Sequence, residues 1–315
     1  ALPLTLSTNP LDRKEFTMSQ PRSRSLILIV VALVLGVLLA WAGSQHGWTL
    51  GGTADAPGIP GFALAVLVAF VVQWIVYIPA AIAQSDRYFD ATGSATYIVV
   101  TILLFAFSPG LDPRNIILTI LVVVWAGRLG SFLFARNRRS GTDDRFDEIK
   151  TSKLRFFSVW TVQGLWVSLT AAAAWISLAS SNQAPLNWTT WVGLAIWIIG
   201  FGFEVVADQQ KRRFKADPAN DGRFIQSGLW SISRHPNYFG EILLWIGVLV
   251  IAAPALQGWQ WIALLSPVFV VVLLTRVSGI PLLEEKAKRK WGDDPEYQAY
   301  RARTSVLIPL PPRGR

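Results

Sequence analysis

Long runs of hydrophobic residues, separated by short polar segments, dominate the chain. Each run except the short third one has about the length that an α-helix needs to cross the roughly 30 Å hydrocarbon layer of a bilayer. The pattern therefore predicts an all-α protein, a polytopic integral membrane helical bundle. The predicted spans cover residues 26–43, 61–83, 95–108, 114–135, 157–179, 190–207, 238–256 and 259–275.

The basic residues follow this pattern of spans. When the polar segments are assigned alternately to the two sides of a membrane, 27 of the 29 Lys and Arg residues fall on one side. The exceptions are Arg114, in an opposite loop, and Arg128, inside a span. By the positive-inside rule the basic side is cytoplasmic, and the even number of spans places both termini there. We expect a multi-pass protein of a bacterial inner membrane, with the lipid bilayer as its partner.

Composition excludes several kinds of site and partner. The net charge of +9 is explained by topology, so no nucleic-acid partner is expected. Without cysteine there are no disulfides, thiolate nucleophiles or cysteine-ligated metals, and with two histidines a histidine-rich metal site is not expected. No glycine-rich motif of the Rossmann or P-loop type occurs. We therefore predict no metal site, and no segment indicates an obligate protein partner.

Three segments divide the chain. Residues 1–17 precede the only methionine, Met18, and show no periodic pattern, so we expect them to be added or unstructured sequence outside the fold. Residues 18–60 contain the first span, which has no polar residue, and a loop rich in Gly, Pro and Ala. We expect them to form a peripheral transmembrane anchor, and residues 61–312 to form the membrane domain that carries the chemistry.

The most informative polar stretch covers residues 228–241 and turns directly into a predicted membrane helix near Asn237. Pro236 suits the first helical position, which makes His235 the predicted N-cap. The free N–H groups of such a helix start, beside Arg234, suit an anion such as a pyrophosphate. An ordinary loop-to-helix junction with a surface arginine explains the same residues, so both interpretations stay open.

Two predicted spans carry charged residues along one helical face as they leave the membrane. The spacing places Arg128 on such a face in one span, and Asp208 and Arg212 on such a face in another. Because a guanidinium inside hydrocarbon is costly unless it is paired or faces a cavity, Arg128 is expected to point into the bundle toward an anion. A salt-bridge network within the protein, including an Asp208–Arg212 pair along the helix, is the alternative.

The segment between the second and third spans, residues 84–94, carries two candidate chemical groups. Asp90 falls in the first turn of a helix or at its cap, and Tyr88 precedes it. Helix capping accounts for Asp90 without any chemistry. The functional alternative is a carboxylate or phenol that hydrogen-bonds a substrate carbonyl and stabilises its oxygen as it becomes an enolate.

Several motifs together resemble the steroid 5-alpha-reductase family and its bacterial 3-oxo-5-alpha-steroid 4-dehydrogenase homologues. They are Ser-Arg-His-Pro-Asn-Tyr-Phe-Gly-Glu at 233–241, Gln-Gly-Leu-Trp at 163–166, the tail from Glu284-Glu285 to Tyr300, and Leu-Ile-Pro at 307–309. The likeness covers roughly residues 61–312. It implies a seven-helix reductase core, to which the first span is an addition.

The resemblance implies an integral-membrane, NADPH-dependent reductase of a carbon–carbon double bond conjugated to a ketone, acting on a 3-oxo-4-ene steroid or a related enone lipid. Where steroid reductases of the family place a Tyr three residues before the matched Arg, this chain has Trp125. The family also implies a Glu on another helix that holds the ketone, and by distance along the chain this Glu falls near Asp90. Asp90, with Tyr88 as a phenolic alternative, is therefore the predicted catalytic carbonyl partner. The positions that match the family's cofactor-binding residues are Arg128, Arg136, Arg139, Asp208, Arg212, Arg223, Arg234, His235, Asn237, Tyr238, Glu241 and Arg276.

Other function classes stay open at this point. Arg-His-Pro-x-Tyr alone is shared with S-adenosylmethionine-dependent methyltransferases of the isoprenylcysteine and phospholipid type, although Asn237 followed by Glu241 favours the reductases. A transporter or lipid-binding protein would be expected to contain two related halves, and no internal repeat is visible. Seven matched arginines exceed what a pyrophosphate requires, which favours NADPH, with its additional 2′-phosphate, over NADH.

Overall fold

The computed structural model describes residues 22–52, 56–110, 112–140 and 144–312, and for 133–140, 144 and 145 it describes the backbone only. Within these residues eight helical segments are long and apolar enough to cross a membrane, as the hydrophobic pattern predicted. The chain is therefore a multi-pass integral membrane protein, an all-helical bundle. Its spans are Arg22–Gly43, Gly61–Ile82, Phe89–Phe107, Pro113–Phe132, Lys153–Ala179, Trp188–Ala216, Pro236–Ala255 and Gly258–Trp291. Residues 1–17 lie outside the described part of the chain.

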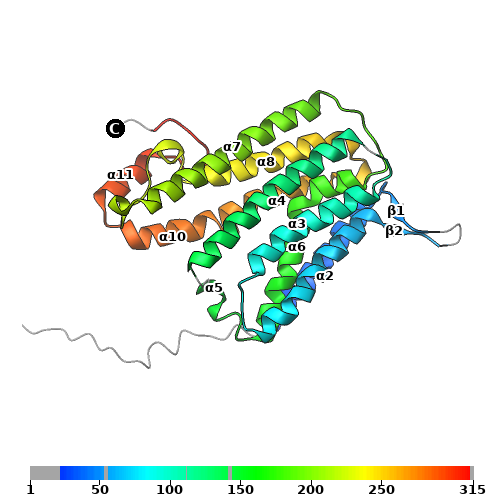
Figure 1. Ribbon diagram of the computed structural model, residues 1–315, viewed down its shortest axis with the longest axis horizontal. Coiled ribbons are helices and arrows are strands. Elements are labelled where there is room, and N and C mark those ends of the chain that lie inside the picture. The colour runs from blue at the N-terminus through cyan, green and yellow to red at the C-terminus, as the bar shows by residue number, and fades with distance from the viewer. Residues whose placement is uncertain (1–21, 53–55, 111, 141–143, 313–315) are drawn as a thin grey trace, which may run out of the picture.

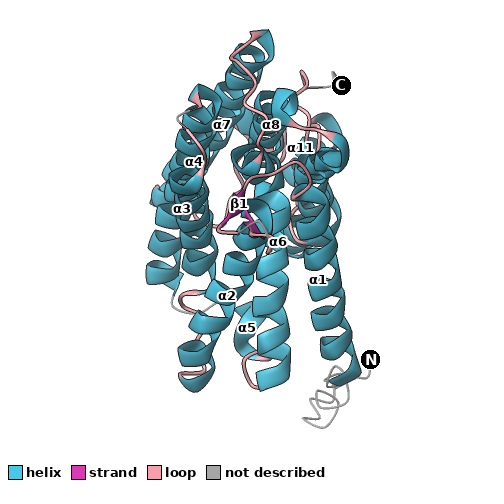
Figure 2. Cartoon of the chain, turned by 90° about the vertical axis from the view of Figure 1, so that its right-hand side faces the viewer, coloured by secondary structure: helices cyan, strands magenta, loops and turns pink. Residues whose placement is uncertain are grey.

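Helices make up nearly all of the described chain, and a short antiparallel hairpin of β1 and β2 is the exception (Figures 1 and 2). The spanning elements are α1 (Arg22–Gly43), α2 (Gly61–Ile82), α3 (Phe89–Phe107), α4 (Pro113–Ser140), α6 (Lys153–Ala179), α7 (Trp188–Ala216), α8 (Pro236–Ala252) and α9 (Leu265–Val272). The shorter elements are β1 (Thr49–Leu50), β2 (Ile59–Pro60), α5 (Asp144–Asp147), η1 (Pro218–Asn220), η2 (Gly228–Ser231), η3 (Ala253–Ala255), η4 (Gly258–Leu264), the π-helical η5 (Leu273–Val277), α10 (Ile280–Trp291) and α11 (Pro295–Arg303).

Helix α6 is the centre of the bundle and is buried along most of its length. It packs against α1, α2, α3, α8 and α9. Its run of four alanines, residues 171–174, is fully buried, and small side chains of this kind allow neighbouring helices to approach closely. Trp160 and Trp175 fill the wider spaces above and below the alanine run.

Glycines bring α7 and α8 into direct backbone contact. A side chain added at Gly200 would place its Cβ 2.5 Å from the backbone nitrogen of Leu244, and one added at Gly247 would lie 2.7 Å from the carbonyl oxygen of Gly193. These distances are shorter than any van der Waals contact, so only glycine fits. The close approach holds Glu204, one turn beyond Gly200, beside the start of α8.

The third span is longer than predicted, because helix α3 begins at Phe89 rather than near residue 95. Its first turns contain polar residues that broke the hydrophobic run. Two of these satisfy their hydroxyls within the helix, since Thr92 donates to the carbonyl of Tyr88 at 2.7 Å and Ser94 donates to that of Asp90 at 3.2 Å. Asp90 thus lies in the first turn of α3, and Tyr88 is the N-cap residue without a side-chain capping bond.

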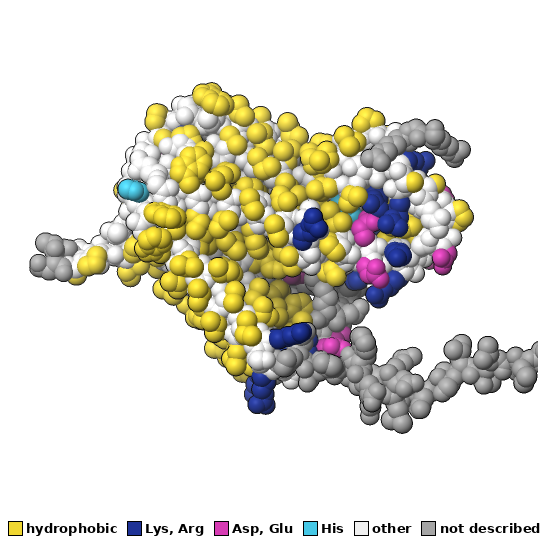
Figure 3. Space-filling view, turned by 180° about the vertical axis from the view of Figure 1, so that it is seen from behind, with side chains coloured by type: hydrophobic (Ala, Val, Ile, Leu, Met, Phe, Trp, Pro, Cys, Tyr) yellow, Lys and Arg dark blue, Asp and Glu magenta, His cyan; other side chains and the backbone are white. Residues whose placement is uncertain are grey.

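The surface divides into an apolar body and one charged end, which contains α10, α11 and the ends of α4 and α7 that lead toward them (Figure 3). At the opposite end, exposed tryptophans stand at the ends of α1 and η4 and at the start of α7: Trp41, Trp188, Trp191, Trp259 and Trp261. Tryptophan is enriched where a membrane meets water.

Arg114, the basic residue of the opposite loop, is fully buried and donates to the carbonyls of Ala184, Pro185 and Ile251. It therefore ties three segments together instead of facing solvent.

Candidate functional site

A cavity of about 1080 Å³ opens between the helices toward the charged end. Its size is at the upper limit of the pockets that hold small-molecule ligands. Residues from α3, α4, α6, α7, α8, α9, η5 and α10 line it. Its polar lining residues are Arg128, Ser131, Thr170, Glu204, Asp208, Lys211, Arg212, Lys215, Asn237 and Glu241. Its aromatic and apolar lining residues are Tyr97, Trp125, Leu129, Phe132, Trp166, Val205, Tyr238, Val270, Leu273, Leu274 and Leu283.

Arg128 is the centre of the polar wall. One guanidinium nitrogen pairs with the carboxylate of Glu204, and the other lies 2.6 Å from Oδ2 of Asp208. All three side chains are mostly buried, with exposed fractions of 19%, 6% and 13%. The arginine therefore points into the bundle, as predicted, and its anionic partners belong to the protein itself. This is the salt-bridge network that the sequence left open as an alternative.

The start of α8 lies beside this network in the cavity lining. Pro236 is the first helical residue and His235 is the N-cap, as predicted. Asn237 Nδ2 donates to Oδ1 of Asp208 at 3.3 Å, which links α8 to α7. The ring of Tyr238 stacks nearly parallel on His235, with ring centroids 5.6 Å apart. Asn237 and Tyr238 both line the cavity.

Glu241 lies one turn deeper on α8, and two indoles hold its carboxylate. Trp125 donates to Oε2 and Trp245 donates to Oε1, each at 3.2 Å. Both oxygens therefore have a donor, and the side chain keeps a fixed orientation at the cavity wall. Glu204 differs, because its Oε2 is buried without a hydrogen-bond partner among the described residues. That oxygen is a free acceptor on the same wall.

Cations lead outward from this wall along α7. Lys211, Arg212 and Lys215 line the cavity beyond Asp208. At a rise of 1.5 Å per residue, the wall from Glu204 to Lys215 is about 17 Å long. Arg212 and Lys215 form no ion pair with any other described residue. The predicted Asp208–Arg212 pair is thus not formed, since Asp208 binds Arg128 instead.

Two of the predicted cofactor residues lie behind this wall and have a partner of their own. Nη1 of Arg234 lies 2.7 Å from Oε2 of Glu284, and Nε2 of His235 lies 2.9 Å from Oε1 of the same carboxylate. Burial lowers the pKa of His235, against the opposing effect of its hydrogen bond to Glu284. Neither side chain lines the cavity. The contacts they make attach α10 to the start of α8.

Two further predicted cofactor residues, Arg223 and Arg276, lie apart from the cavity lining. Arg223 is exposed in the segment between η1 and η2, and Arg276 is exposed on η5. Arg136 and Arg139 belong to the last turns of α4, but their side chains lie outside the described part of the structure. The structure therefore brings six of the twelve together around the cavity: Arg128, Asp208, Arg212, Asn237, Tyr238 and Glu241.

The predicted carbonyl partners also lie off the cavity. Tyr88 is 52% exposed, and the guanidinium of Arg87 lies 5.5 Å from its ring centroid. Asp90 is half-buried in the first turn of α3. Neither is among the residues that line the cavity, and their catalytic role stays a prediction. The hydroxyl groups that the inner cavity does contain belong to Tyr97 and Thr170, which sequence reasoning missed.

A signal for Tyr97 existed in the sequence, because a phenol inside a span needs a polar partner or a cavity. Lys211 had no comparable signal, since it lies among several basic residues at the end of α7. No group of three or more His, Cys, Asp or Glu side chains among the described residues is arranged to hold a metal ion.

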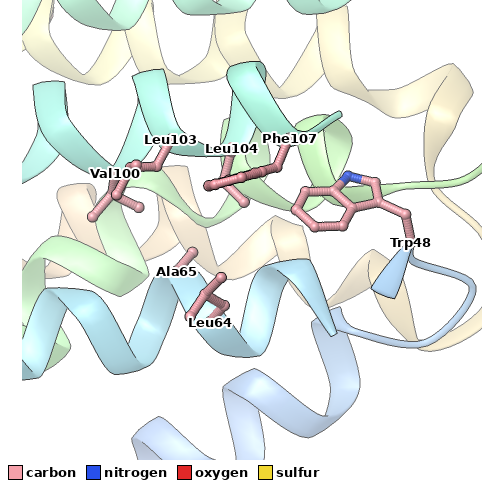
Figure 4. A pocket seen from close by; sticks show the side chains of 7 residues that line it. All are labelled: Trp48, Leu64, Ala65, Val100, Leu103, Leu104 and Phe107. Atoms are coloured by element: carbon pink, nitrogen blue, oxygen red, sulfur yellow. The ribbon is translucent and has the colours of Figure 1, made fainter. Parts of the chain in front are cut away.

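A second pocket lies near the opposite end of the bundle and is much smaller, at about 30 Å³. Figure 4 shows its lining, which consists of hydrophobic side chains from α2 and α3 and of Trp48. The indole nitrogen of Trp48 donates to the carbonyl of Leu178 at 3.0 Å, so its N–H group already has an acceptor within the protein. This pocket has no group that could bind or activate a polar substrate.

Comparison with known proteins gives a family and distant relatives. The model of the family described as "Protein of unknown function (DUF1295)" matches residues 74–304. An uncharacterized protein of Schizosaccharomyces pombe, C594.04c, is 26% identical over 226 residues, which are 62% of this chain and 63% of that protein. No solved structure matches the chain.

Two further relatives are steroid 5-alpha-reductases of plants. The steroid 5-alpha-reductase DET2 of Arabidopsis thaliana is 28% identical over 94 residues, which are 28% of this chain and 33% of that protein. The DET2 protein of Gossypium hirsutum is 29% identical over 141 residues, 44% of this chain and 50% of that protein. The chain thus spans less than two thirds of the length of each relative. The resemblance to steroid 5-alpha-reductases is distant and partial.

Proposed function

The chain belongs to the DUF1295 family, and we propose that it is an integral-membrane reductase that uses NADPH to reduce a carbon–carbon double bond conjugated to a ketone. The observation that carries the proposal is the cavity, in which a cationic outer wall continues into an aromatic interior within the bundle. A phosphate-bearing cofactor suits the first part and a flat lipid suits the second. The partial similarity to steroid 5-alpha-reductases supports the same pairing.

The residues of the cavity fit a reduced nicotinamide dinucleotide phosphate. Arg212 and Lys215 are cations without an ion pair to a described residue, and guanidinium and ammonium groups bind phosphate through charge-assisted hydrogen bonds. The free Oε2 of Glu204 can accept from an amide N–H, a donor that nicotinamide carries. When bound, the reduced nicotinamide supplies the hydride that reduces the double bond.

The protein's own part is to position and to exclude water. Arg128 fixes Glu204 and Asp208, and Asn237 joins Asp208 to the start of α8, so the polar wall keeps its shape before any ligand binds. Trp125 is held by Glu241, and its ring lies against Trp245 with centroids 4.8 Å apart. A wall fixed in this way keeps water from the reacting carbons without moving during the reaction.

The substrate class follows from the aromatic and aliphatic interior. Trp125, Trp166, Val270 and Leu274 offer a dry surface to a flat hydrophobic molecule, and an enone lipid such as a 3-oxo-4-ene steroid has that shape. Because the cavity lies within the bundle, such a substrate arrives from the bilayer.

Topology and domain division belong to the same proposal. We assign the charged end to the cytoplasm of a bacterial inner membrane, since that end carries the excess of Lys and Arg and receives the cofactor from the cytosol. Residues 61–312 are proposed as the reductase domain. Residues 18–60 are proposed as an anchor, in which α1 packs on the outside of α2 and α6.

The function is tested with purified protein in lipid nanodiscs. The protein is incubated with NADPH and a 3-oxo-4-ene steroid, while the absorbance of the reduced nicotinamide and the mass of the steroid are followed together. The expected result is NADPH oxidation that requires the steroid, with a product that has gained two hydrogen atoms. Methyl transfer from S-adenosylmethionine to a lipid, without NADPH oxidation on any enone, contradicts the proposal.

A pair of adjacent arginines provides the matched control. Both side chains are exposed, but Arg212 lines the cavity, whereas Arg213, the next residue of α7, does not. Arg212→Ala should raise the Michaelis constant for NADPH on the order of tenfold, the value of a hydrogen bond to a charged group. Arg213→Ala should leave it unchanged. Equal effects of the two changes would show that general charge, and not the cavity wall, binds the cofactor.

A further inference from the structure

The inner cavity contains two hydroxyl groups from neighbouring helices. Hydrogen bonds give the register of these helices, because Gln163 of α6 donates to the carbonyl of Phe89 of α3, and Trp175 of α6 donates to Thr101 of α3. The partners in both bonds are 74 positions apart. The same offset places Tyr97 level with Ala171, the neighbour of Thr170 on α6, so the side chains of Tyr97 and Thr170 lie near each other. Both residues line the cavity.

Thr170 and Ser177 are the two hydroxyl residues of α6 without a hydrogen-bond partner among the described residues, and of the two only Thr170 lines the cavity. Ser158, Thr161 and Ser168 each donate to a backbone carbonyl three or four residues earlier on α6. Thr170 is only 4% exposed, yet its Oγ1 has no hydrogen-bond partner that meets normal geometry among the described residues. A buried hydroxyl without a partner destabilises the protein. Thr170 lines the cavity, so a ligand atom that reaches this hydroxyl can remove that cost.

Tyr97 is held in one orientation by aromatic neighbours. Its ring packs edge-to-face against Trp125 of α4, with ring centroids 5.0 Å apart, and the ring centroid of Trp175 of α6 lies 6.4 Å away. The side chain is 6% exposed. Its hydroxyl is therefore directed by packing, which is the condition for a donor that does not reorganise during a reaction.

Arg128 and Glu241, the charged residues beside Trp125 in the cavity lining, already have partners within the protein. The guanidinium of Arg128 is shared between Glu204 and Asp208, and both oxygens of Glu241 already accept from indoles. A carboxylate would repel the negative charge that develops on the oxygen. The neutral hydroxyls of Tyr97 and Thr170 are donors that carry no charge and belong to the inner wall.

We propose that Tyr97 is a catalytic residue that donates a hydrogen bond to the carbonyl oxygen of the enone substrate, with Thr170 as the second donor to the same oxygen. The inference rests on the proposed function and deepens it. As hydride from the reduced nicotinamide forms a bond to the β-carbon, the carbon–carbon π bond breaks and its electron pair moves to the oxygen as an enolate. The two hydroxyls stabilise that oxygen, and water protonates the α-carbon, which restores the ketone.

The first arm of the test measures turnover. Tyr97→Phe should lower kcat for the steroid on the order of 100- to 1000-fold, as loss of a donor to an oxyanion does, with little change in the Michaelis constant. Thr170→Val should lower kcat about tenfold, the effect of a neutral hydrogen bond. Tyr77→Phe is the matched control, because the hydroxyl of Tyr77 donates to the carbonyl of Lys153 outside the cavity. It should keep wild-type kcat.

The second arm needs no turnover. Difference infrared spectra are recorded of a 3-oxo-4-ene steroid with a carbon-13 carbonyl, bound to the protein without NADPH. In wild type and in Tyr77→Phe, the carbonyl band should lie below its frequency in a hydrocarbon solvent. It should move toward the hydrocarbon value in Tyr97→Phe and part of the way in Thr170→Val, which also serves if Tyr97→Phe does not fold.

The outcomes separate the inference from the function on which it rests. Wild-type kcat together with a wild-type carbonyl band in Tyr97→Phe would overturn the inference while the reductase function stands. A Thr170→Val protein that also matches wild type in both arms would remove the second donor. If wild-type protein oxidises no NADPH with any enone, the proposed function fails, and the inference fails with it.

Discussion

Arg128 offers the most direct structural test of the polar wall. Arg128→Met keeps a side chain of similar length and leaves the carboxylates of Glu204 and Asp208 without their cation. The three side chains are at most 19% exposed, so water can screen this loss only in part. Removing one partner of a buried ion pair costs about 3–5 kcal/mol. The midpoint of thermal unfolding should fall on the order of 10 °C.

The assay is thermal unfolding in detergent, followed by intrinsic fluorescence, with Arg213→Met as the exposed control. A triple variant, Arg128→Met with Glu204→Gln and Asp208→Asn, removes the uncompensated charges and should recover most of the lost midpoint. Reductase activity should stay absent, because the wall no longer has its shape. A triple variant as unstable as Arg128→Met, or a single variant as stable as wild type, would refute the role of Arg128 as the paired centre of the wall.

Two further predictions concern the framework around the site. Gly200→Val should separate α7 from α8 and abolish both stability and activity, because its Cβ would lie 2.5 Å from the Leu244 backbone. Gly202→Val should be tolerated, because no atom lies within 4 Å of the added Cβ. The midpoints of thermal unfolding of the two variants test this difference. Burial lowers the pKa of His235, so the stability that neutral His235 contributes is complete above its unfolded pKa of about 6.5 and is lost as the pH falls through the folded value. The midpoint of thermal unfolding should therefore fall between about pH 7 and about pH 5, the range around that unfolded pKa, and His235→Gln should lack this decline. An identical decline in that variant would contradict the role of His235.

The sequence predicts the parts of this fold that depend on local pattern. All eight spans follow from hydrophobic length alone, and the start of α8 follows from the proline at its first position. The shared face of Asp208 and Arg212 also follows from helical spacing. These features require no knowledge of which helices meet. The added turns at the start of α3 were missed because Thr92 and Ser94 interrupt the hydrophobic run while their hydroxyls are satisfied inside the helix.

Features that depend on contacts between distant segments could not be predicted in this way. Arg234 lies beside the helix start as expected, but its guanidinium forms an ion pair with Glu284, 50 residues later in the chain. Asp208 has two candidate cations within reach of its helix face, and the structure pairs it with Arg128, 80 residues earlier. Tyr97 reaches the cavity only because α3 and α6 lie side by side in a particular register. Each case is decided by packing and not by local spacing.

The central claim, that the cationic wall of the cavity binds NADPH, is tested most directly by equilibrium binding. Affinities for NADPH and NADH are measured by titration calorimetry with wild type, with Arg212→Ala combined with Lys215→Ala, and with Arg213→Ala as the control. The account predicts that wild type and the control bind NADPH more tightly than NADH, and that the double variant loses this preference. Equal affinity of the wild type for the two cofactors, or a preference that survives in the double variant, would contradict it.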